Sequence, residues 1–239
     1  MAVEGRKNQI VIVGVAIAAA VVAAAVAGWL VAGMPSGSTR TMDELRALPL
    51  VSTLMADDPA VATRLRAALE EEQRNPTLQG PTRPFLVIAE LRKTHIGPAL
   101  SAADDASAIA VMTARAELVR HLQKTDLPAC RQFSGNGIQR VDKLDAEGAR
   151  LFRNLLTAME AAYRSGRAPD AKPQPAASDQ DFAAMLMEGG ITQADLQKLA
   201  DILKLADAEL CELELRVDLT PTILAAEKRG AFARFILTH

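Results

Sequence analysis

An uncharged apolar stretch near the N-terminus limits what this chain can fold into more than any other part of its sequence. Residues 10–34 are mainly Ile, Val, Ala, Leu and Gly with one Trp29, and nothing ionisable lies between Lys7 and Arg40. As a helix, about 25 such residues are long enough to cross a hydrocarbon core of about 30 Å with some tilt. Because backbone polar groups in lipid must bond one another, the stretch is expected to form a transmembrane helix.

The same stretch also has the outline of a secretory signal peptide. A basic start at Arg6 and Lys7 is followed by an apolar centre and then by the small residues 25–27, which resemble a cleavage site. The apolar run nevertheless continues through residues 29–32, whereas the apolar part of a signal peptide is usually ~7–15 residues long. We therefore favour a permanent anchor and keep cleavage as the alternative.

The orientation of such an anchor is set by the basic residues that flank it. Arg6 and Lys7 precede the apolar run and Arg40 and Arg46 follow it, so the counts on the two sides nearly tie. The basic pair on the N-terminal side lies closer to the run, while the exit through residues 35–39 is uncharged. We therefore expect the N-terminus in the cytoplasm and everything after the run on the other side of the membrane.

The chain is therefore expected to have four parts. Residues 1–9 form a cytoplasmic tail, 10–34 a transmembrane helix, and 35–40 a short linker. Residues 41–239 form an extracytoplasmic helical domain with an exposed, Pro- and Ala-rich loop near 166–177. The Ala-rich sequence uses Arg more than Lys, which is compatible with a bacterial source. The membrane is then the inner membrane and the outer compartment the periplasm.

Small residues recur every four positions along one face of the expected membrane helix. The stripe consists of Ala20, Ala24, Gly28 and Ala32. Small side chains let two helices approach closely in lipid, so the stripe is a candidate contact for a partner helix or for a second copy of this chain, as in a homo-oligomer. An Ala-rich helix also shows such a stripe by chance.

Beyond the apolar run, composition indicates a helical domain that does not bind nucleic acid. Over the whole chain, 27 Lys and Arg nearly balance 29 Asp and Glu, and no basic face of the kind found in nucleic-acid-binding proteins is present. Aromatic residues make up 3% of the chain, which leaves no platform for stacking bases. Ala and Leu dominate while Thr, Tyr and Val are scarce, which favours helix over strand. We expect an all-α fold with a multi-helix bundle.

Capping residues and helix breakers indicate where the helices of this bundle begin and end. N-cap signals stand at Thr41, Asp58, Ser101 or Asp104, Asp145, Ser178 and Thr192. The Pro- and Gly-containing segment 75–84 is expected to be a loop. A helix that starts near Phe85 is expected to end at Gly97-Pro98. Residues 127–137, with one proline and two glycines, are expected to form a loop and a turn.

A final helix is expected to start at Thr220-Pro221. The segment between Thr192 and this helix carries the most regular apolar spacing outside the N-terminal run. Its apolar residues alternate three and four apart: Leu196, Leu199, Leu203, Ala206, Leu210, Leu213 and Val217. The spacing predicts one long helix, which as a coiled coil would pair with another chain. It spans only about three heptads, and further apolar residues widen its face, so we favour the middle of an intramolecular bundle.

The chain has two cysteines, Cys130 and Cys211. Cys130 is expected in a loop after Pro128, and Cys211 on the long helix. In an oxidising compartment this even count predicts one disulfide, which would close a loop of about 80 residues and contribute about 4 kcal/mol in the chain-entropy model. It would join the helices before the 166–177 loop to those after it. The alternative is two separate buried thiols.

The sequence gives little support for catalysis or metal binding. Its histidines are His95, His121 and His239. His95 beside Arg92 and Lys93 is interpreted as a cationic helix end, and His121 as a partly exposed surface or packing residue. None of the common hydrolase, zinc-protease, phosphate-loop, paired-cysteine or EF-hand motifs is present. No catalytic residue, cofactor or metal is therefore expected.

Together these features predict a function exerted through contacts. We expect a single-pass membrane protein that acts as an interaction or scaffolding subunit of an inner-membrane complex, with the lipid bilayer and a protein as partners. The first alternative is a periplasmic helical binding protein released by signal cleavage. The second is an enzyme whose catalytic residues are brought together only by the fold.

Overall fold

A computed structural model describes residues 42–77, 83–135, 138, 143–172, 174 and 177–238. Every regular element within these ranges is a helix, and no strand is present among them, which confirms the expected all-α class. The apolar segment 10–34 and its small-residue stripe lie outside the described residues. Within the described ranges, no helix combines the length and the apolar character needed to cross a bilayer.

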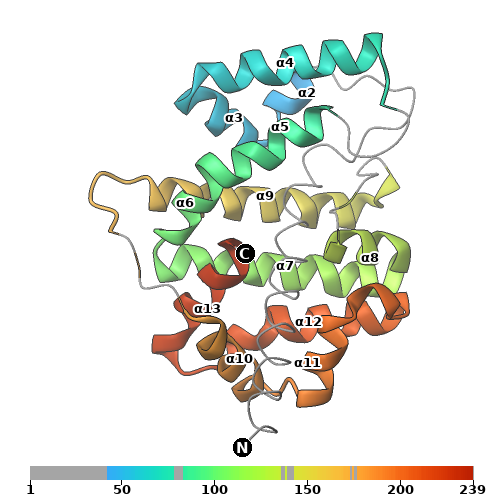
Figure 1. Ribbon diagram of the computed structural model, residues 1–239, viewed down its shortest axis with the longest axis vertical. Helices are drawn as coiled ribbons and strands as arrows, with labels where there is room; N and C mark the ends of the chain where they lie inside the picture. The colour runs from blue at the N-terminus through green and yellow to red at the C-terminus, as the bar shows by residue number, and fades with distance from the viewer. Residues whose placement is uncertain are drawn as a thin grey trace, which may run out of the picture.

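Helices follow one another with short connections through most of the described chain (Figure 1). In order they are α2 (Met42–Arg46), α3 (Pro49–Asp57), α4 (Pro59–Arg74), α5 (Arg83–Leu91), the π-helical turn η1 (Arg92–Ile96), α6 (Gly97–Ser101), α7 (Asp105–Thr125), α8 (Leu127–Gly135), α9 (Ala146–Gly166), α10 (Asp179–Glu188), α11 (Gln193–Ala200), the 3-10 turn η3 (Ile202–Lys204), α12 (Asp207–Ile223) and α13 (Ala226–Thr238).

Helix α7 lies in the middle of the fold. It packs against α9 on one side and against α12 and α13 on the other, with α8 alongside its C-terminal half (Figure 1). Helices α3, α4 and α5 form a further layer. This layer is connected to the rest of the fold by α3, which packs against α9. The helices after the 166–177 loop thus cover the face of α7 that α9 leaves open, so the described residues form one packed unit.

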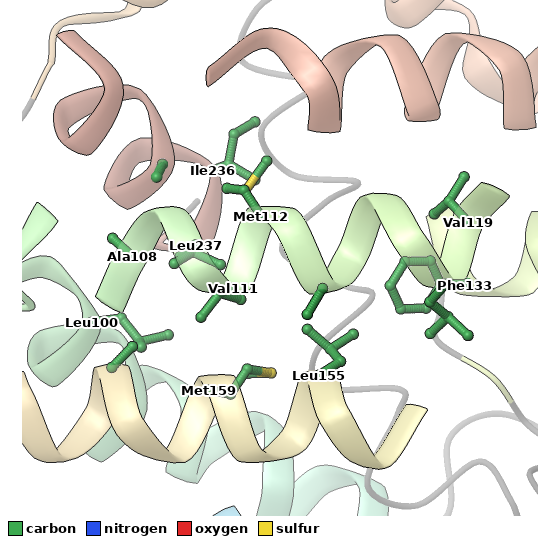
Figure 2. Close-up of a cluster of buried hydrophobic side chains, with 14 of the residues drawn as sticks. Leu100, Ala108, Val111, Met112, Val119, Phe133, Leu155, Met159, Ile236 and Leu237 are labelled. Atoms are coloured by element: carbon green, nitrogen blue, oxygen red, sulfur yellow. The ribbon is translucent and has the colours of Figure 1, made fainter. Parts of the chain in front are cut away.

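The core is built from apolar side chains on several sides of α7. Figure 2 shows Val111 facing Leu155 and Met159 of α9, while Met112 lies next to Ile236 of α13. All five of these side chains are at most 2% exposed. A helix that is apolar on more than one side belongs in the interior of a domain, and the sequence of α7 therefore places it there.

Most of the expected helix starts are confirmed by capping hydrogen bonds. The side chains of Asp58, Asp104 and Asp145 accept from backbone N–H groups in the first turns of α4, α7 and α9. Ser178 with Asp181 and Thr192 with Asp195 form capping boxes at α10 and α11. Thr41 lies outside the described residues. Local N-cap chemistry was therefore enough to locate these boundaries.

The prediction that Gly97-Pro98 ends a helix is wrong. The chain stays helical from Arg83 to Ser101, because the π-helical turn η1 lies directly before the proline. The N–H of Gly97 donates to the carbonyl of Arg92, five residues back. Pro98 has no N–H to donate, and it occupies the first turn of α6, where none is needed.

The prediction of a loop around Cys130 is also wrong. Cys130 lies inside α8, which continues through Phe133 to Gly135, so the expected turn at 133–137 does not begin at Phe133. Asp126 accepts from the N–H of Ala129 at 3.0 Å and so caps this helix. Pro128 stands in the first turn, where a proline fits without loss of a hydrogen bond.

The regular apolar segment after Thr192 is not one long helix. It folds back on itself at residues 201–206, so that α11 lies against α12: Lys198 pairs with Glu209 at 2.6 Å, and Asp195 with Arg216 at 2.9 Å. A continuous coiled-coil seam is therefore excluded in this region. The two halves line one core instead, which agrees with the prediction that this segment belongs to an intramolecular bundle.

The last helix begins later than expected. Pro221 lies inside α12, which ends two residues beyond it, and α13 begins at Ala226. Pro221 has no N–H to donate to the carbonyl four residues back, and α12 continues for only two residues beyond it. After α9 the described residues of the 166–177 loop are mostly exposed, as expected.

A glycine at the end of α9 permits close contact with α6. A Cβ atom at Gly166 would lie 1.7 Å from the carbonyl oxygen of Ala99, so Gly166→Ala must push the two helices apart. We expect a loss of about 1–3 kcal/mol in the free energy of unfolding, measured by urea denaturation of the purified chain. The control Ala161→Ser also adds one heavy atom to α9, at an exposed position. Equal stability of the two variants would contradict this contact.

Candidate functional site

Three charged side chains are buried where α7, α8 and α12 meet. They are Arg115 on α7 and Glu214 and Asp218 on α12, and each is at most 2% exposed. Charged side chains are almost never buried so fully unless they are paired. This cluster, called the charge cluster below, is therefore the first candidate for a site that does more than hold the fold together.

One guanidinium bridges the two carboxyl groups of the charge cluster. Arg115 donates from Nε to Oδ1 of Asp218 at 3.0 Å and from Nη2 to Oε1 of Glu214. The two acids are four residues apart on α12, so they share one face of that helix. The ring of Phe133 on α8 lies 5.0 Å from the guanidinium carbon and adds a cation–π contact.

The electrostatics of the charge cluster are unbalanced, because two acids face one base. Burial raises the pKa of Glu214 to about 8, and the charge of Asp218 acts in the same direction while Arg115 opposes it. Burial also raises the pKa of Asp218. Burial lowers the pKa of Arg115, but both carboxylates outweigh this and raise it above its usual value. The arginine is thus always charged, and the acids compete for it.

Two further features show how the charge cluster is enclosed. Oδ2 of Asp218 is buried without a hydrogen-bond partner among the described residues. Arg92 of η1 is a second cation near Arg115: burial and the charge of Arg115 lower the pKa of Arg92 to about 10. The cluster therefore lies in an interior where solvent does little to screen its charges.

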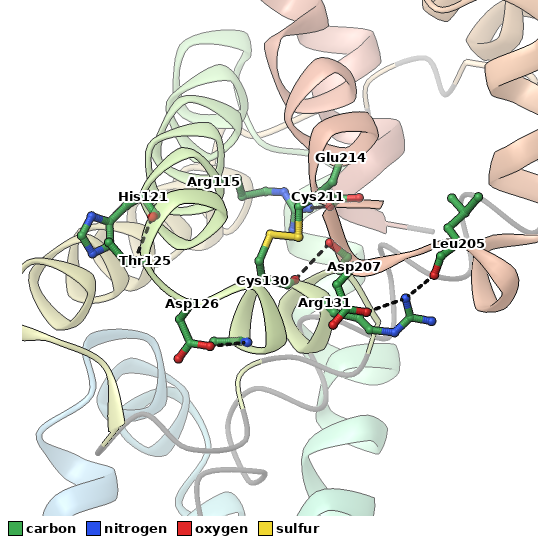
Figure 3. The surroundings of a disulfide bond; sticks show 12 residues. Arg115, His121, Thr125, Asp126, Cys130, Arg131, Leu205, Asp207, Cys211 and Glu214 are labelled. Carbon is green, nitrogen blue, oxygen red and sulfur yellow. Dashed lines mark hydrogen bonds and ion pairs between the residues drawn. A yellow bond between two sulfur atoms is a disulfide. The ribbon is translucent and has the colours of Figure 1, made fainter. Parts of the chain in front are cut away.

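The two cysteines come together beside the charge cluster, as expected. The sulfur atoms of Cys130 and Cys211 are 2.18 Å apart and their Cα atoms 6.0 Å apart, across 81 residues of sequence. Figure 3 shows the bond next to Arg115 and Glu214. Cys211 lies three residues before Glu214. The same turns of α12 are therefore attached to α8 by the disulfide and to α7 by the ion pairs.

A second arginine holds the start of α12 against α8. Arg131 donates to the carbonyl of Leu205 at 2.7 Å and to Asp207 at 3.1 Å (Figure 3). It lies next to Cys130 in the sequence. Helices α8 and α12 are therefore joined by the cysteine pair and by this arginine, and α12 is joined to α7 by the charge cluster.

His121 lies away from the charge cluster, on the solvent side of α7. Its Nε2 is 2.8 Å from Oδ1 of Asp145, the N-cap of α9, and its side chain is 18% exposed, in keeping with a partly exposed packing residue. It lines an open groove of about 580 Å³ between α7 and α9. The other lining residues are Glu117, Arg120, Lys124, Glu147, Arg150, Leu151 and Asn154. This part of the groove contains no hydroxyl or thiol that could serve as a nucleophile.

His95 does not end a helix, because the chain stays helical on both sides of it. Its Nε2 lies 3.3 Å from Oδ2 of Asp58, so the two described histidines bind different acids and form no joint site. His239 lies outside the described residues. Within the ranges that the structure covers, no group of three or more His, Cys, Asp and Glu side chains could hold a metal ion.

The charge cluster was not recognised from the sequence, although its spacing carried a signal. Arg115 lies three residues after Met112 and four before Val119, on a face of α7 that is otherwise apolar. Glu214 lies four residues after Leu210, within the apolar pattern of α12. Charged residues at core positions of two helices indicate that they pair with each other.

No protein family, curated protein or solved structure matches this chain. Its function is therefore inferred from its own residues and their arrangement.

The cysteine pair should make a measurable contribution to stability. The double variant Cys130→Ala/Cys211→Ala is expected to lose about 2–5 kcal/mol in the free energy of unfolding, because the unfolded chain is no longer cross-linked. Urea denaturation with and without reductant measures this loss. The wild type should lose stability on reduction, whereas the double variant should not respond. Identical curves for oxidised and reduced wild type would contradict a bond between these residues.

Proposed function

We propose that this protein is a membrane-anchored interaction or scaffolding subunit of a bacterial inner-membrane complex. Residues 10–34 anchor it, its N-terminus lies in the cytoplasm, and its helical domain works in the periplasm. The domain acts by presenting a rigid helical surface to a partner protein, without a cofactor. The all-helical architecture and the paired cysteines support this proposal, as does the uncharged apolar run.

The observation that carries the proposal is the pairing of Cys130 and Cys211 in a chain that also has a membrane-length apolar run. Disulfides form and persist in the periplasm and are rare in the bacterial cytosol. The two cysteines are the only ones in the chain and both are fully buried, which suits a structural bond and not an exposed reactive thiol. The apolar run supplies the route to that compartment.

The described surface offers a place for a partner near the ends of α10 and α12. Met187 and Ile223 are 48% and 60% exposed, large for apolar side chains. The two helix ends touch, because a Cβ atom at Gly189 would lie 2.6 Å from Thr220. Large exposed apolar side chains are a feature of protein-contact surfaces. We propose that this surface, called the α10/α12 end, meets the partner.

Signal cleavage is the competing possibility, favoured by the small residues 25–27 at the end of the apolar centre. The domain would then be a free periplasmic binding protein with the same fold. N-terminal sequencing of the mature chain distinguishes the two, because only the anchored form retains residues 1–27.

The anchor makes a prediction about fractionation. The wild type should remain in the membrane pellet after a carbonate wash, and protease added to spheroplasts should digest its domain. Val21→Asp/Val22→Asp should release the chain from the pellet or block its export, because each Asp at the centre of a membrane helix costs about 2.5–3.5 kcal/mol.

The matched control for the anchor is Ser38→Asp/Thr39→Asp, which places the same charges in the linker and should fractionate like the wild type. Wild-type protein in the wash supernatant, or a domain protected from protease in spheroplasts, would contradict the anchored orientation.

The partner surface makes a separate prediction. A photoreactive amino acid placed at position 223 or 187 should give a defined cross-linked product in living cells, because both side chains lie on the α10/α12 end. The control is position 212, which is exposed on α12 several turns before that end. Equal products from all three positions, or none from 187 and 223, would contradict the assigned surface.

A further inference from the structure

The charge cluster contains one acid more than it can neutralise. Arg115 supplies one positive charge to Glu214 and Asp218, so ionisation of both acids leaves a net negative charge in the core. An uncompensated charge in a protein interior is strongly unfavourable. Uptake of one proton by the acids removes it.

Among the described residues, Arg115 and Asp218 are the charges that bear on Glu214, and Arg115 is the charge that bears on Asp218, while Arg92 of η1 interacts with Arg115. The charged groups on the packed helices are engaged elsewhere. Arg131 of α8 pairs with Asp207, Arg234 of α13 with Asp105, Glu188 of α10 with Lys228, Lys198 of α11 with Glu209, and Asp195 of α11 with Arg216.

The surroundings of Glu214 do not solvate a carboxylate. Glu214 borders a small void of about 10 Å³ between α10, α11, α12 and α13, about the space of one water molecule. Its other walls are apolar: Phe182, Leu186, Leu199, Ile202, Val217 and Ile236. On the side of this void, therefore, the ionised side chain meets no polar group of the described residues that compensates for lost water.

We infer that Glu214 is a proton-binding site built into the core, which makes the packing of α12 against α7 respond to pH. The neutral carboxyl accepts from Arg115 and fits the apolar void. The ionised carboxylate requires water, so it weakens the packing of α10 and α11 over the void. The cysteine pair, three residues away at Cys211, keeps this part of α12 attached to α8 while the packing loosens.

The direction of the pH response follows from the proton balance. The pKa of Glu214 is raised by burial to about 8 in the folded protein, from about 4.5 when exposed. Between these values the folded state binds more protons than the unfolded state, so this group makes stability fall as the pH rises. Its contribution is most favourable below about pH 4.5 and changes no further well above pH 8.

Urea denaturation of the purified chain between pH 5 and 9.5 tests this inference. Relative to Glu214→Gln, the wild-type unfolding constant should rise on the order of a hundredfold or more across this range, because each pKa unit is worth tenfold. The glutamine keeps the shape and charge of the neutral acid. The control Glu212→Gln changes an exposed acid of the same helix and should keep the wild-type response. A Glu214→Gln chain as pH-sensitive as Glu212→Gln would overturn the inference.

An infrared measurement reads the proton directly and does not depend on unfolding. The wild type at pH 6 should show the band of a buried protonated carboxyl, which should disappear with a midpoint near pH 8 and be absent from Glu214→Gln. Asp218→Asn removes the neighbouring charge and leaves Glu214 balanced by Arg115, so it should move the midpoint to lower pH. Absence of the band from the wild type at pH 6, or its persistence in Glu214→Gln, would show that Glu214 does not hold the proton.

Discussion

The fold depends on the burial of α7 from more than one side. Because α9 covers one face and α12 and α13 cover another, α7 supplies core residues on more than one side. Its one buried base, Arg115, then has no route to solvent and must be matched inside the protein. The acids of α12 are that match, so the central position of α7 determines both the layered architecture and the position of the charge cluster.

Much of the local structure could be predicted because it depends on nearby residues. Asp58, Asp104, Asp145, Ser178 and Thr192 cap helices through hydrogen bonds that reach only two or three residues along the chain. The pairing of the two cysteines was also predictable, because an even count left few arrangements. Which helices they join was not predictable, since the proline and glycines around Cys130 favour a loop where the structure has α8.

The remaining differences arise where tertiary packing decides between local alternatives. Apolar residues three and four apart fit a straight helix, and they equally fit two helices folded onto one core, as α11 and α12 are. Gly97-Pro98 does not end its helix, because the π turn η1 precedes it and Pro98 falls in the first turn of α6. The charge cluster was missed because the overall charge of the chain is nearly balanced. Only the positions of Arg115 and Glu214 among apolar residues indicated it, and that pattern identifies neither partner.

The chain order of the central layer has a consequence for biogenesis. Arg115 and its partner Glu214 are separated by 99 positions, and α13 follows later still. While the polypeptide is synthesised from its N-terminus, α7 and α9 can associate early, but the opposite face of α7 stays exposed until the C-terminal helices are made. Long-range contacts of this kind form slowly, and until they form the apolar surfaces stay exposed and prone to aggregation. A chaperone that binds exposed apolar surface would thus have a defined client face on α7, and it would release that face only once α12 and α13 had packed against it.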